Sequence, residues 1–390
     1  MPPHQAVAAY GGVSAIPIFT WAQPSAGNRA FTEAYLTQPV AMGTVSYRAL
    51  SAVGTLDLEG LTLRRGELTS GAWGEGFVDR RHPHSYIHEA MLGGVTGVRS
   101  AAMSLFAGRG FVPFGTDDPM TRPFVKYPAN HHLSQILERL VVVGAVSVGP
   151  FVVEGGTFNG DEPQSPSSAP HWGRFGDSWS TRLTWRPRST IELSYSHAFV
   201  KSPESAEGGT FDQWKNDAAV RWASSSGMID YALLEWARTD EGQHGNRAFR
   251  YDSFLGEFDA RLSRVHGAFR VEHTARPEEE RLADLFRTVH PVTDVSILGV
   301  SQWTTLTANV TADWFFARAF RAAPFVEGSF SYVTHGTPAG LVDLNSLYGN
   351  RRLWTLSVGV RLGVGHQHDR MGRYGVALPI RVMHMPSMSM

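Results

Sequence analysis

Apolar and polar side chains alternate along most of the chain between residues 174 and 365. In 189–200, Ile191, Tyr195 and Phe199 share one face, while Glu192 and Ser196 lie on the other. This period of two predicts β-strands, because successive side chains of a strand point to opposite faces. Runs of about 10–15 residues exceed the usual strand of a soluble protein. They suit the roughly 9–11 residues that a tilted strand needs to cross a bilayer.

The same pattern divides the chain into strands joined by connections of alternating length. It predicts a first strand at 43–58 and a last strand at 351–365. Between them it predicts six pairs of strands, at 86–98/100–109, 136–147/149–158, 175–187/189–200, 212–224/227–238, 249–263/265–275 and 300–316/319–333. Tight turns alternate with long connections such as 59–85, 110–135 and 239–248, as in outer-membrane barrels. We therefore predict an all-β fold, a transmembrane antiparallel β-barrel of about 14 strands within a range of about 12–16.

This interpretation gives three parts: an irregular N-terminal segment (1–39, with Pro17, Pro24 and Pro39), the barrel (40–365) and a C-terminal tail rich in His and Met (366–390). In the last strand, Leu356, Val358, Val360 and Leu362 are expected to face lipid.

Composition agrees with a barrel. Hydrophobic residues make up 42% and charged residues 18%, and there is no cysteine, which excludes disulfides and thiolate metal sites. The longest apolar run, 140–153, is shorter than the roughly 20 residues of a membrane-spanning helix. A net charge of −1 argues against a nucleic-acid partner. We expect a bacterial outer-membrane location; the N-terminus lacks the charged and apolar regions of a signal peptide, so such a peptide would already be removed.

Aromatic residues gather near the ends of the expected strands, where interface girdles form in membrane barrels. They are Trp172, Trp179, Trp185, Trp214, Trp222, Trp303, Trp314, Phe316, Tyr332 and Trp354. Packing in any β core is the alternative explanation for these residues.

If the apolar face meets lipid, the polar face lines the interior. That face carries both signs of charge in similar numbers: Arg182, Arg186, Glu192, Lys215, Asp217, Arg221, Glu257, Asp259, Arg261, Arg270, Glu272, Asp313, Glu327 and Arg361. A barrel of this size is wider than the roughly eight strands that side chains alone can fill, so water or an inserted loop must occupy it.

The connection 110–135 is the best candidate for such a loop. Four prolines stiffen it, and Phe111, Phe114 and Phe124 need burial. We predict that it folds into the barrel as a constriction and brings four polar side chains to the solute path, namely Arg122, Lys126, His131 and His132.

Residues 105–161 carry a family-like pattern. A Gly-x-Phe-x-Pro-Phe-Gly-type turn is followed by Glu-Arg and by a Gly-rich strand pair closing in Phe-Asn-Gly, the residues being Gly110, Phe111, Pro113, Phe114, Gly115, Glu138, Arg139, Gly144, Phe158, Asn159 and Gly160. This stretch resembles the phosphate-selective porin O and P family of outer-membrane porins. The resemblance implies a trimeric or monomeric 16-strand anion channel. The chain departs from the family in its mixed lining and its three lysines, which puts anion selectivity in doubt.

Histidines cluster at His82, His84 and His88, and at His131 and His132, and the tail adds His366, His368, Met383, His384, Met385, Met388 and Met390. Imidazole and thioether groups bind zinc or copper, but polar loop residues and a frayed terminus explain these clusters as well. No nucleophile, base and orienting group recur at a catalytic spacing, so we expect neither an enzyme nor a cofactor.

Together these features predict a porin-like channel in which small hydrophilic solutes or ions diffuse passively, with lipid as its surroundings and a homotrimer as a possible assembly. Two alternatives stay open. One is an envelope barrel that handles copper or zinc, and the other is a structural or adhesive barrel with a plugged lumen.

Overall fold

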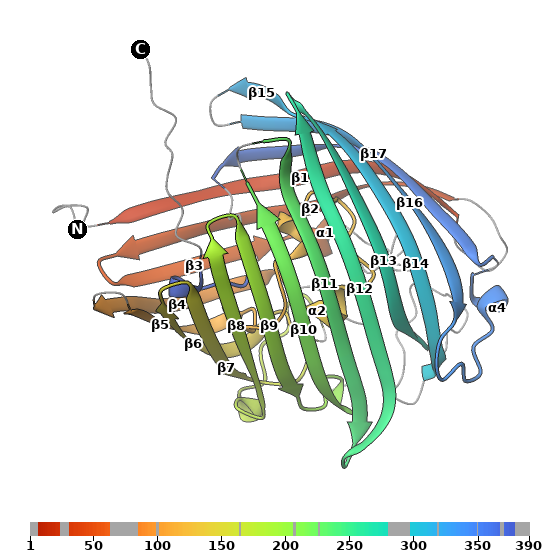
Figure 1. The fold of residues 1–390 in the computed structure, drawn as a ribbon, viewed down its shortest axis with the longest axis horizontal. Helices are drawn as coiled ribbons and strands as arrows, with labels where there is room; N and C mark the ends of the chain where they lie inside the picture. Colours follow the sequence, from red (N-terminus) through yellow and green to blue (C-terminus); the bar gives the residue numbers. More distant parts are fainter. Residues whose placement is uncertain are drawn as a thin grey trace.

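The computed structural model describes residues 7–23, 31–62, 85–98, 101–163, 165–205, 208–224, 227–279, 297–317, 320–348, 350–366 and 370–378. The strands in these ranges form one antiparallel sheet that closes on itself (Figure 1). β15 continues β14 beyond Asp313 and pairs with the same neighbour, β16, so the described strands make a barrel of sixteen. The predicted fold class is confirmed.

The strands run in chain order around the wall. They are β1 (Ala8–Gln23), β2 (Phe31–Tyr47), β3 (Leu50–Asp57), β4 (Ile87–Val98), β5 (Ala101–Gly110), β6 (Arg139–Val148), β7 (Phe151–Phe158), β8 (Ser178–Arg188), β9 (Ile191–Val200), β10 (Asp212–Ala223), β11 (Ile229–Gln243), β12 (Asn246–Leu262), β13 (Val265–Glu279), β14 (Ile297–Ala312), β15 (Trp314–Ala317), β16 (Phe320–His335) and β17 (Arg352–Gly365). Short helices lie between or after them: α1 (Glu59–Thr62), η1 (Pro119–Thr121), α2 (His131–Ser134), η2 (Trp172–Arg174), α4 (Leu344–Tyr348) and η4 (Gly375–Ala377). Among the described residues, no helix has the length and apolar character to cross a membrane.

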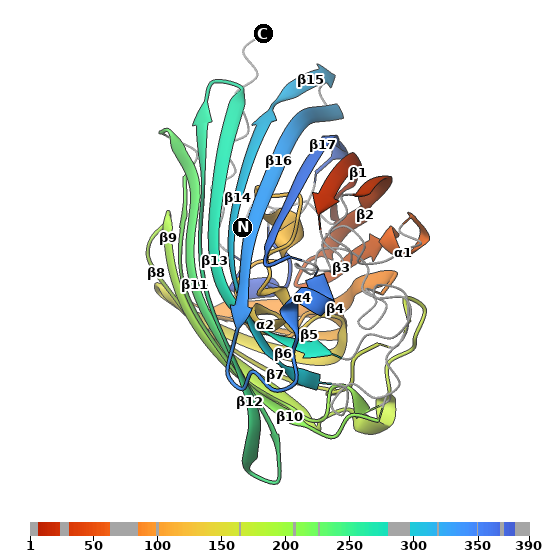
Figure 2. The same cartoon turned by 90° about the vertical axis from the view of Figure 1, so that its right-hand side faces the viewer.

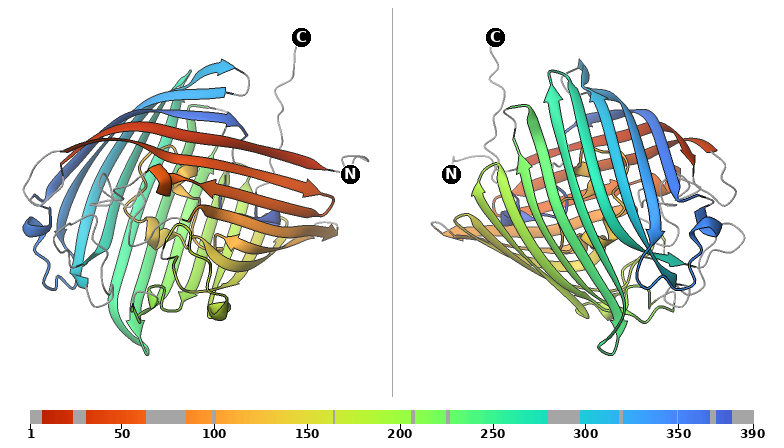
Figure 3. Two further views of the ribbon diagram at one scale, coloured as in Figure 1. Left: turned by 180° about the vertical axis from the view of Figure 1, so that it is seen from behind. Right: turned by 45° about the vertical axis from the view of Figure 1, so that its right-hand side comes forward.

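β1 closes the barrel, because it pairs with β2 on one side and with β17 on the other. Ile18, for example, lies opposite Tyr35 of β2 and Gly359 of β17. Figure 3 shows the first and last strands side by side in the view from behind. The short turns, the start of β1 and the end of β17 share one rim, called here the turn side. Most long connections leave the barrel at the other rim, called here the loop side.

The N-terminal region differs from the prediction. The segment 1–39, expected to be irregular, contains β1 and half of β2. Pro17 lies next to a break in the β1–β2 register, and an irregular ladder of this kind tolerates a residue without an N–H group. The strand expected at 43–58 is a hairpin instead, since it turns at 48–49, where Arg48 adopts a φ of 53°. These two differences account for sixteen strands in place of fourteen.

The 239–248 connection, expected to be a long loop, also differs. β11 and β12 continue through it to a two-residue turn at His244 and Gly245, both with positive φ. The hairpin therefore extends past the neighbouring strands, as Figure 2 shows at its lower edge.

The side-chain alternation sets the two faces of the wall as predicted. On β9, Glu192 and Ser196 are buried while Tyr195 is exposed, and on β17 Ser357 is buried while Leu356 is 41% exposed. Outward apolar side chains recur on strands around the barrel. Such a surface matches a lipid environment, where the hydrophobic effect does not penalise it.

Aromatic side chains form a band near each rim. Trp214 and Trp222 both face outward on β10 and are separated by eight positions, about 26 Å along a strand. That span is comparable to the roughly 25 Å apolar band of an outer-membrane barrel. Trp303 is an exception to the predicted girdle: it points inward, is fully buried and packs edge-on against Tyr348 of α4. The side chain of Phe316 lies outside the described part.

Candidate solute pathway

The predicted interior residues all lie on the inner face or at its ends, and most make ion pairs. Five of these pairs join Arg182 to Glu154 (2.6 Å), Arg270 to Glu257 (2.8 Å), Arg186 to Glu192 (2.9 Å), Arg221 to Asp117 (3.0 Å) and Arg261 to Asp230 (3.1 Å). Asp217, Glu272 and Glu327 are also buried. Charge is therefore paired locally, between neighbouring strands or, for Arg221, between a strand and the 110–135 connection, and is not segregated to opposite walls.

Residues 111–138, called here the inserted loop, fill the middle of the barrel, as Figure 2 shows around α2. Phe111, Phe114 and Phe124 are each no more than 3% exposed. Phe114 packs with Val112 and Ile136 against wall residues of β6 and β7, including Val141 and Phe158. Burial of these rings provides the apolar contribution that holds the loop inside.

Wall carboxylates accept hydrogen bonds from the backbone of the inserted loop. Glu327 accepts from the N–H groups of Val125 (2.7 Å) and Lys126 (2.9 Å), and Glu272 accepts from that of Ala129 (2.7 Å). A carboxylate is a strong acceptor, and loss of one of these acceptors would leave a buried N–H group without this partner.

Wall cations bind the carbonyl groups of the same loop. Arg361 donates to the carbonyl of Pro123 (2.6 Å), Lys215 to that of His132 (2.6 Å), Arg270 to that of Lys126 (3.0 Å) and Arg182 to that of Gly115 (3.2 Å). Because these wall residues come from β8, β10, β13 and β17, the loop is fixed from several directions at once.

Arg122 anchors the centre of the loop. Its guanidinium lies 3.3 Å from Glu235 and 3.5 Å from Glu257, and it donates to the carbonyl of Asp117. Burial lowers the pKa of Arg122, but these two carboxylates raise it further, so the net pKa lies above the usual value. Arg122 is therefore a permanent cation within a network of carboxylates.

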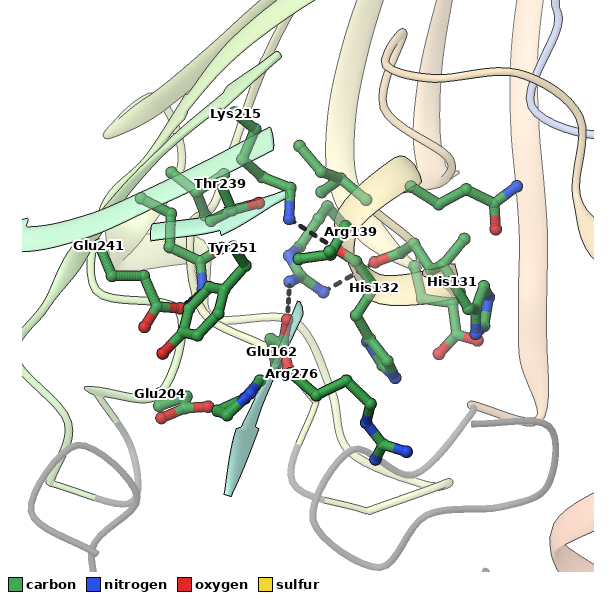
Figure 4. Close-up of a pocket in the computed structure, with 18 of the residues that line it drawn as sticks. His131, His132, Arg139, Glu162, Glu204, Lys215, Thr239, Glu241, Tyr251 and Arg276 are labelled. Carbon is green, nitrogen blue, oxygen red and sulfur yellow. Dashed lines mark hydrogen bonds and ion pairs between the residues drawn. The ribbon is translucent and has the colours of Figure 1, made fainter. Parts of the chain in front are cut away.

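The described residues leave a cavity on each side of the inserted loop. The loop-side cavity has a volume of about 120 Å³, and Figure 4 shows its polar lining. His131, His132 and Lys215 line it together with residues that the sequence patterns did not single out as lining: Arg139, Glu162, Glu204, Glu241 and Arg276. Glu204 and Glu241 lie to one side in Figure 4, and His131 lies across from them.

The turn-side cavity is larger, about 550 Å³. Its charged lining includes Arg122 of the inserted loop and four predicted interior residues, Arg221, Asp259, Asp313 and Arg361. Lys126 lines neither of these two cavities and is buried. The structure thus brings the loop residues Arg122, His131 and His132 to cavities, whereas several predicted lining residues, such as Glu272 and Glu327, bind the loop instead.

Sequence patterns missed a second internal segment. Residues 370–378, called here the C-terminal segment, return into the barrel after β17, and Arg370, Met371, Arg373 and Tyr374 are buried there. The tail 366–390 was expected to fray, and no local signal opposes that expectation. The partners of Arg370 are Asp117 and Glu192, which lie 253 and 178 positions away along the chain.

The residues that carry the family resemblance serve mainly to position the inserted loop. Gly115 has a φ of +70°, and a Cβ there would lie 1.6 Å from the carbonyl oxygen of Ser134, so only glycine fits. Glu138 accepts from the N–H of Ser85, and Asn159 accepts from that of Leu140. The motif therefore shapes the entry and exit of the loop.

Among the described residues, the metal-ligand candidates do not gather in one group of three or more. His82, His84, His368 and the tail methionines lie outside the described residues. His88 is buried with Nδ1 2.9 Å from Glu138, and its ring packs against Phe111. A different group, Asp230, Asp259 and His266, places its ligand atoms within 4.8 Å of one another. Ion pairs explain that group: His266 lies between Asp259 (3.0 Å) and Asp313 (3.2 Å), and Arg261 pairs with Asp230.

Comparison with known proteins supports the fold. No protein-family model matches the chain, and no curated protein matches its sequence. Among solved structures, the chain is similar to an anion-selective porin from Comamonas acidovorans, with a TM-score of 0.51 and 13% identity over 92% of this chain and 99% of that one. It is also similar to the outer-membrane expressed OmpT of Vibrio cholerae, with a TM-score of 0.50 and 9% identity over 93% and 99% of the two chains. At these identities the likeness concerns the fold alone.

Proposed function

We propose that this protein is an outer-membrane channel through which small hydrophilic solutes or ions diffuse passively. The observation that carries the proposal is the combination of an apolar outer wall with a charged interior that keeps a cavity on each side of the inserted loop. Charged side chains such as Arg122, Arg221 and Arg361 line the turn-side cavity, as expected along a hydrated path.

Selectivity by charge is expected to be weak. Lys215, Arg139 and Arg276 offer an anion favourable contacts in the loop-side cavity, and the similar Comamonas porin is anion-selective. Glu204 and Glu241 line the same cavity, however, and oppose an anion. A phosphate-selective channel, as the family resemblance implies, needs an excess of cations that this lining lacks.

Single-channel recording in planar bilayers tests the proposal. We expect discrete conductance steps, and a small reversal potential across a KCl gradient because both signs of charge line the cavities. The folded state is checked by the shift in electrophoretic mobility that a barrel shows on heating. Folded protein that gives no conductance steps (silent bilayers) would contradict the channel function.

A structural or adhesive barrel is the second candidate, because the inserted loop and the C-terminal segment both occupy the interior. Silent bilayers would favour it. The metal-handling alternative is not proposed, because His88 pairs with Glu138 and His266 lies between Asp259 and Asp313. A homotrimer remains a prediction, which crosslinking in detergent followed by electrophoresis tests directly.

A further inference from the structure

The C-terminal segment lies against the inner face of the first half of the wall. Figure 1 shows it in dark blue beside β4. Within it, Met371, Tyr374 and Ala377 are no more than 2% exposed. Side chains buried this deeply must match their surroundings in shape and polarity, because orphaned buried polar groups are costly.

Two arginines of the segment bind carboxylates of the wall and the inserted loop. Arg370 donates to Asp117 through Nε and to Glu192 through Nη2 at 2.9 Å. Arg373 lies 3.2 Å from Glu192 and 3.4 Å from Glu154, and it donates to the hydroxyl of Thr184. Glu192 therefore binds both guanidinium groups. Arg370 uses two of its nitrogens to join Asp117 and Glu192, a forked geometry that arginine provides and lysine does not.

Backbone and aromatic contacts complete the fit. The Tyr374 hydroxyl donates to Glu89 (2.8 Å) and accepts from the N–H of Phe111 (3.0 Å). Two further wall arginines donate to the backbone of the C-terminal segment: Arg182 to the carbonyl of Gly372 and Arg186 to that of Ala377. The segment is thus recognised as an extended peptide, through both its side chains and its carbonyl groups.

Charge balance shows what the site becomes without the segment. Its surroundings then hold four carboxylates, Glu89, Asp117, Glu154 and Glu192, and three arginines, Arg182, Arg186 and Arg221. Loss of Arg370 and Arg373 removes two positive charges from this half of the lumen. The vacated surface would be a net anionic site with the geometry to bind guanidinium groups.

We propose that Asp117, Glu154 and Glu192 form a guanidinium-peptide binding site, that the C-terminal segment is its resident ligand, and that this segment plugs half of the lumen. An arginine-containing peptide in trans can take its place once the segment is removed. The binding site stands independently of the channel proposal, whereas the role as a plug rests on it.

The first experiment tests the plug. A chain ending at residue 366 retains β17, and a full-length Arg370→Glu/Arg373→Glu variant keeps the chain length in case the truncation does not fold. Both should show higher single-channel conductance and a reversal potential shifted toward cations. Arg247→Glu, an exposed residue of the β11–β12 hairpin, is the matched control and should leave both unchanged. Wild-type conductance and selectivity in the truncated and double variants would overturn the plug.

The second experiment tests the site without relying on conduction. A fluorescent peptide with the sequence of residues 370–378 is titrated into the truncated barrel in detergent, and binding is followed by anisotropy. We expect saturable binding that falls at least about tenfold when both peptide arginines are replaced by alanine. Equal binding of the two peptides, or none by either, would overturn the site even if the barrel conducts. Silent bilayers with intact peptide binding would instead refute the channel and the plug.

Discussion

The attachment of the inserted loop to Glu327 can be tested by one substitution. Glu327 of β16 is 1% exposed and accepts from the N–H groups of Val125 and Lys126 and from the Asn309 side chain. Glu327→Ala removes all three acceptor contacts and leaves two buried backbone N–H groups without this partner. A bond to a charged acceptor contributes about 1.5–3 kcal/mol, so we expect the loop tip to be destabilised locally by about 3–5 kcal/mol.

Trypsin provides the assay. Within 111–138 the only arginine or lysine residues, after which trypsin cuts, are Arg122, which precedes a proline and resists cleavage, and Lys126. Lys126 is 5% exposed, so the wild-type loop should resist trypsin while Glu327→Ala is cut after Lys126, a product that mass spectrometry identifies. Increased conductance noise should accompany this cleavage, because a loose loop samples more than one position in the lumen.

Two further variants sharpen the test. Glu327→Gln keeps an acceptor oxygen for one N–H but not the charge, so its cleavage rate should fall between those of wild type and Glu327→Ala. Asp252→Ala removes a carboxylate from the partly exposed pair with Arg238, away from the loop, and should stay resistant. If Glu327→Ala resists trypsin as the wild type does, the carboxylate does not hold the loop and the reasoning is wrong.

Four more predictions concern the inserted loop, the outer wall, the turn-side cavity and the ion pairs of Asp117. Deletion of 116–130 should raise single-channel conductance, and unchanged steps would refute the constriction. Leu234→Arg, on the outward face (66% exposed) near the middle of β11, should destabilise the barrel by about 2–4 kcal/mol in liposome unfolding, whereas Leu262→Arg near the turn should cost about 1 kcal/mol or less. Arg361→Glu, in the turn-side cavity, should shift the reversal potential toward cations. Burial raises the pKa of Asp117 but neighbouring arginines lower it below its usual value, so its ion pairs persist above about pH 4 and weaken below; conductance should hold steady down to about pH 5 and rise only under about pH 4.

The sequence by itself determined the fold class and the two faces of the wall. Alternation along strands such as β9 and β17 gives each strand an apolar face, which must meet an apolar environment, and a polar face, which must meet a polar one. The strand lengths suit a bilayer. It also indicated that residues 110–135 fold inward, because three phenylalanine rings in a stiff connection need burial. Local chemistry was sufficient for these conclusions since each depends on neighbouring residues alone.

Only the tertiary structure decided the N-terminal strands and the partners of the charges. The turn at 48–49 contains no glycine or proline, and β1 joins the wall by pairing with β2 on one side and with β17, from the far end of the chain, on the other. Alternation places Glu192 on the inner face but says nothing of Arg370, which reaches it across 178 positions. Which buried charges meet depends on barrel closure and on the path of the two internal segments, and these long-range contacts leave no period in the sequence.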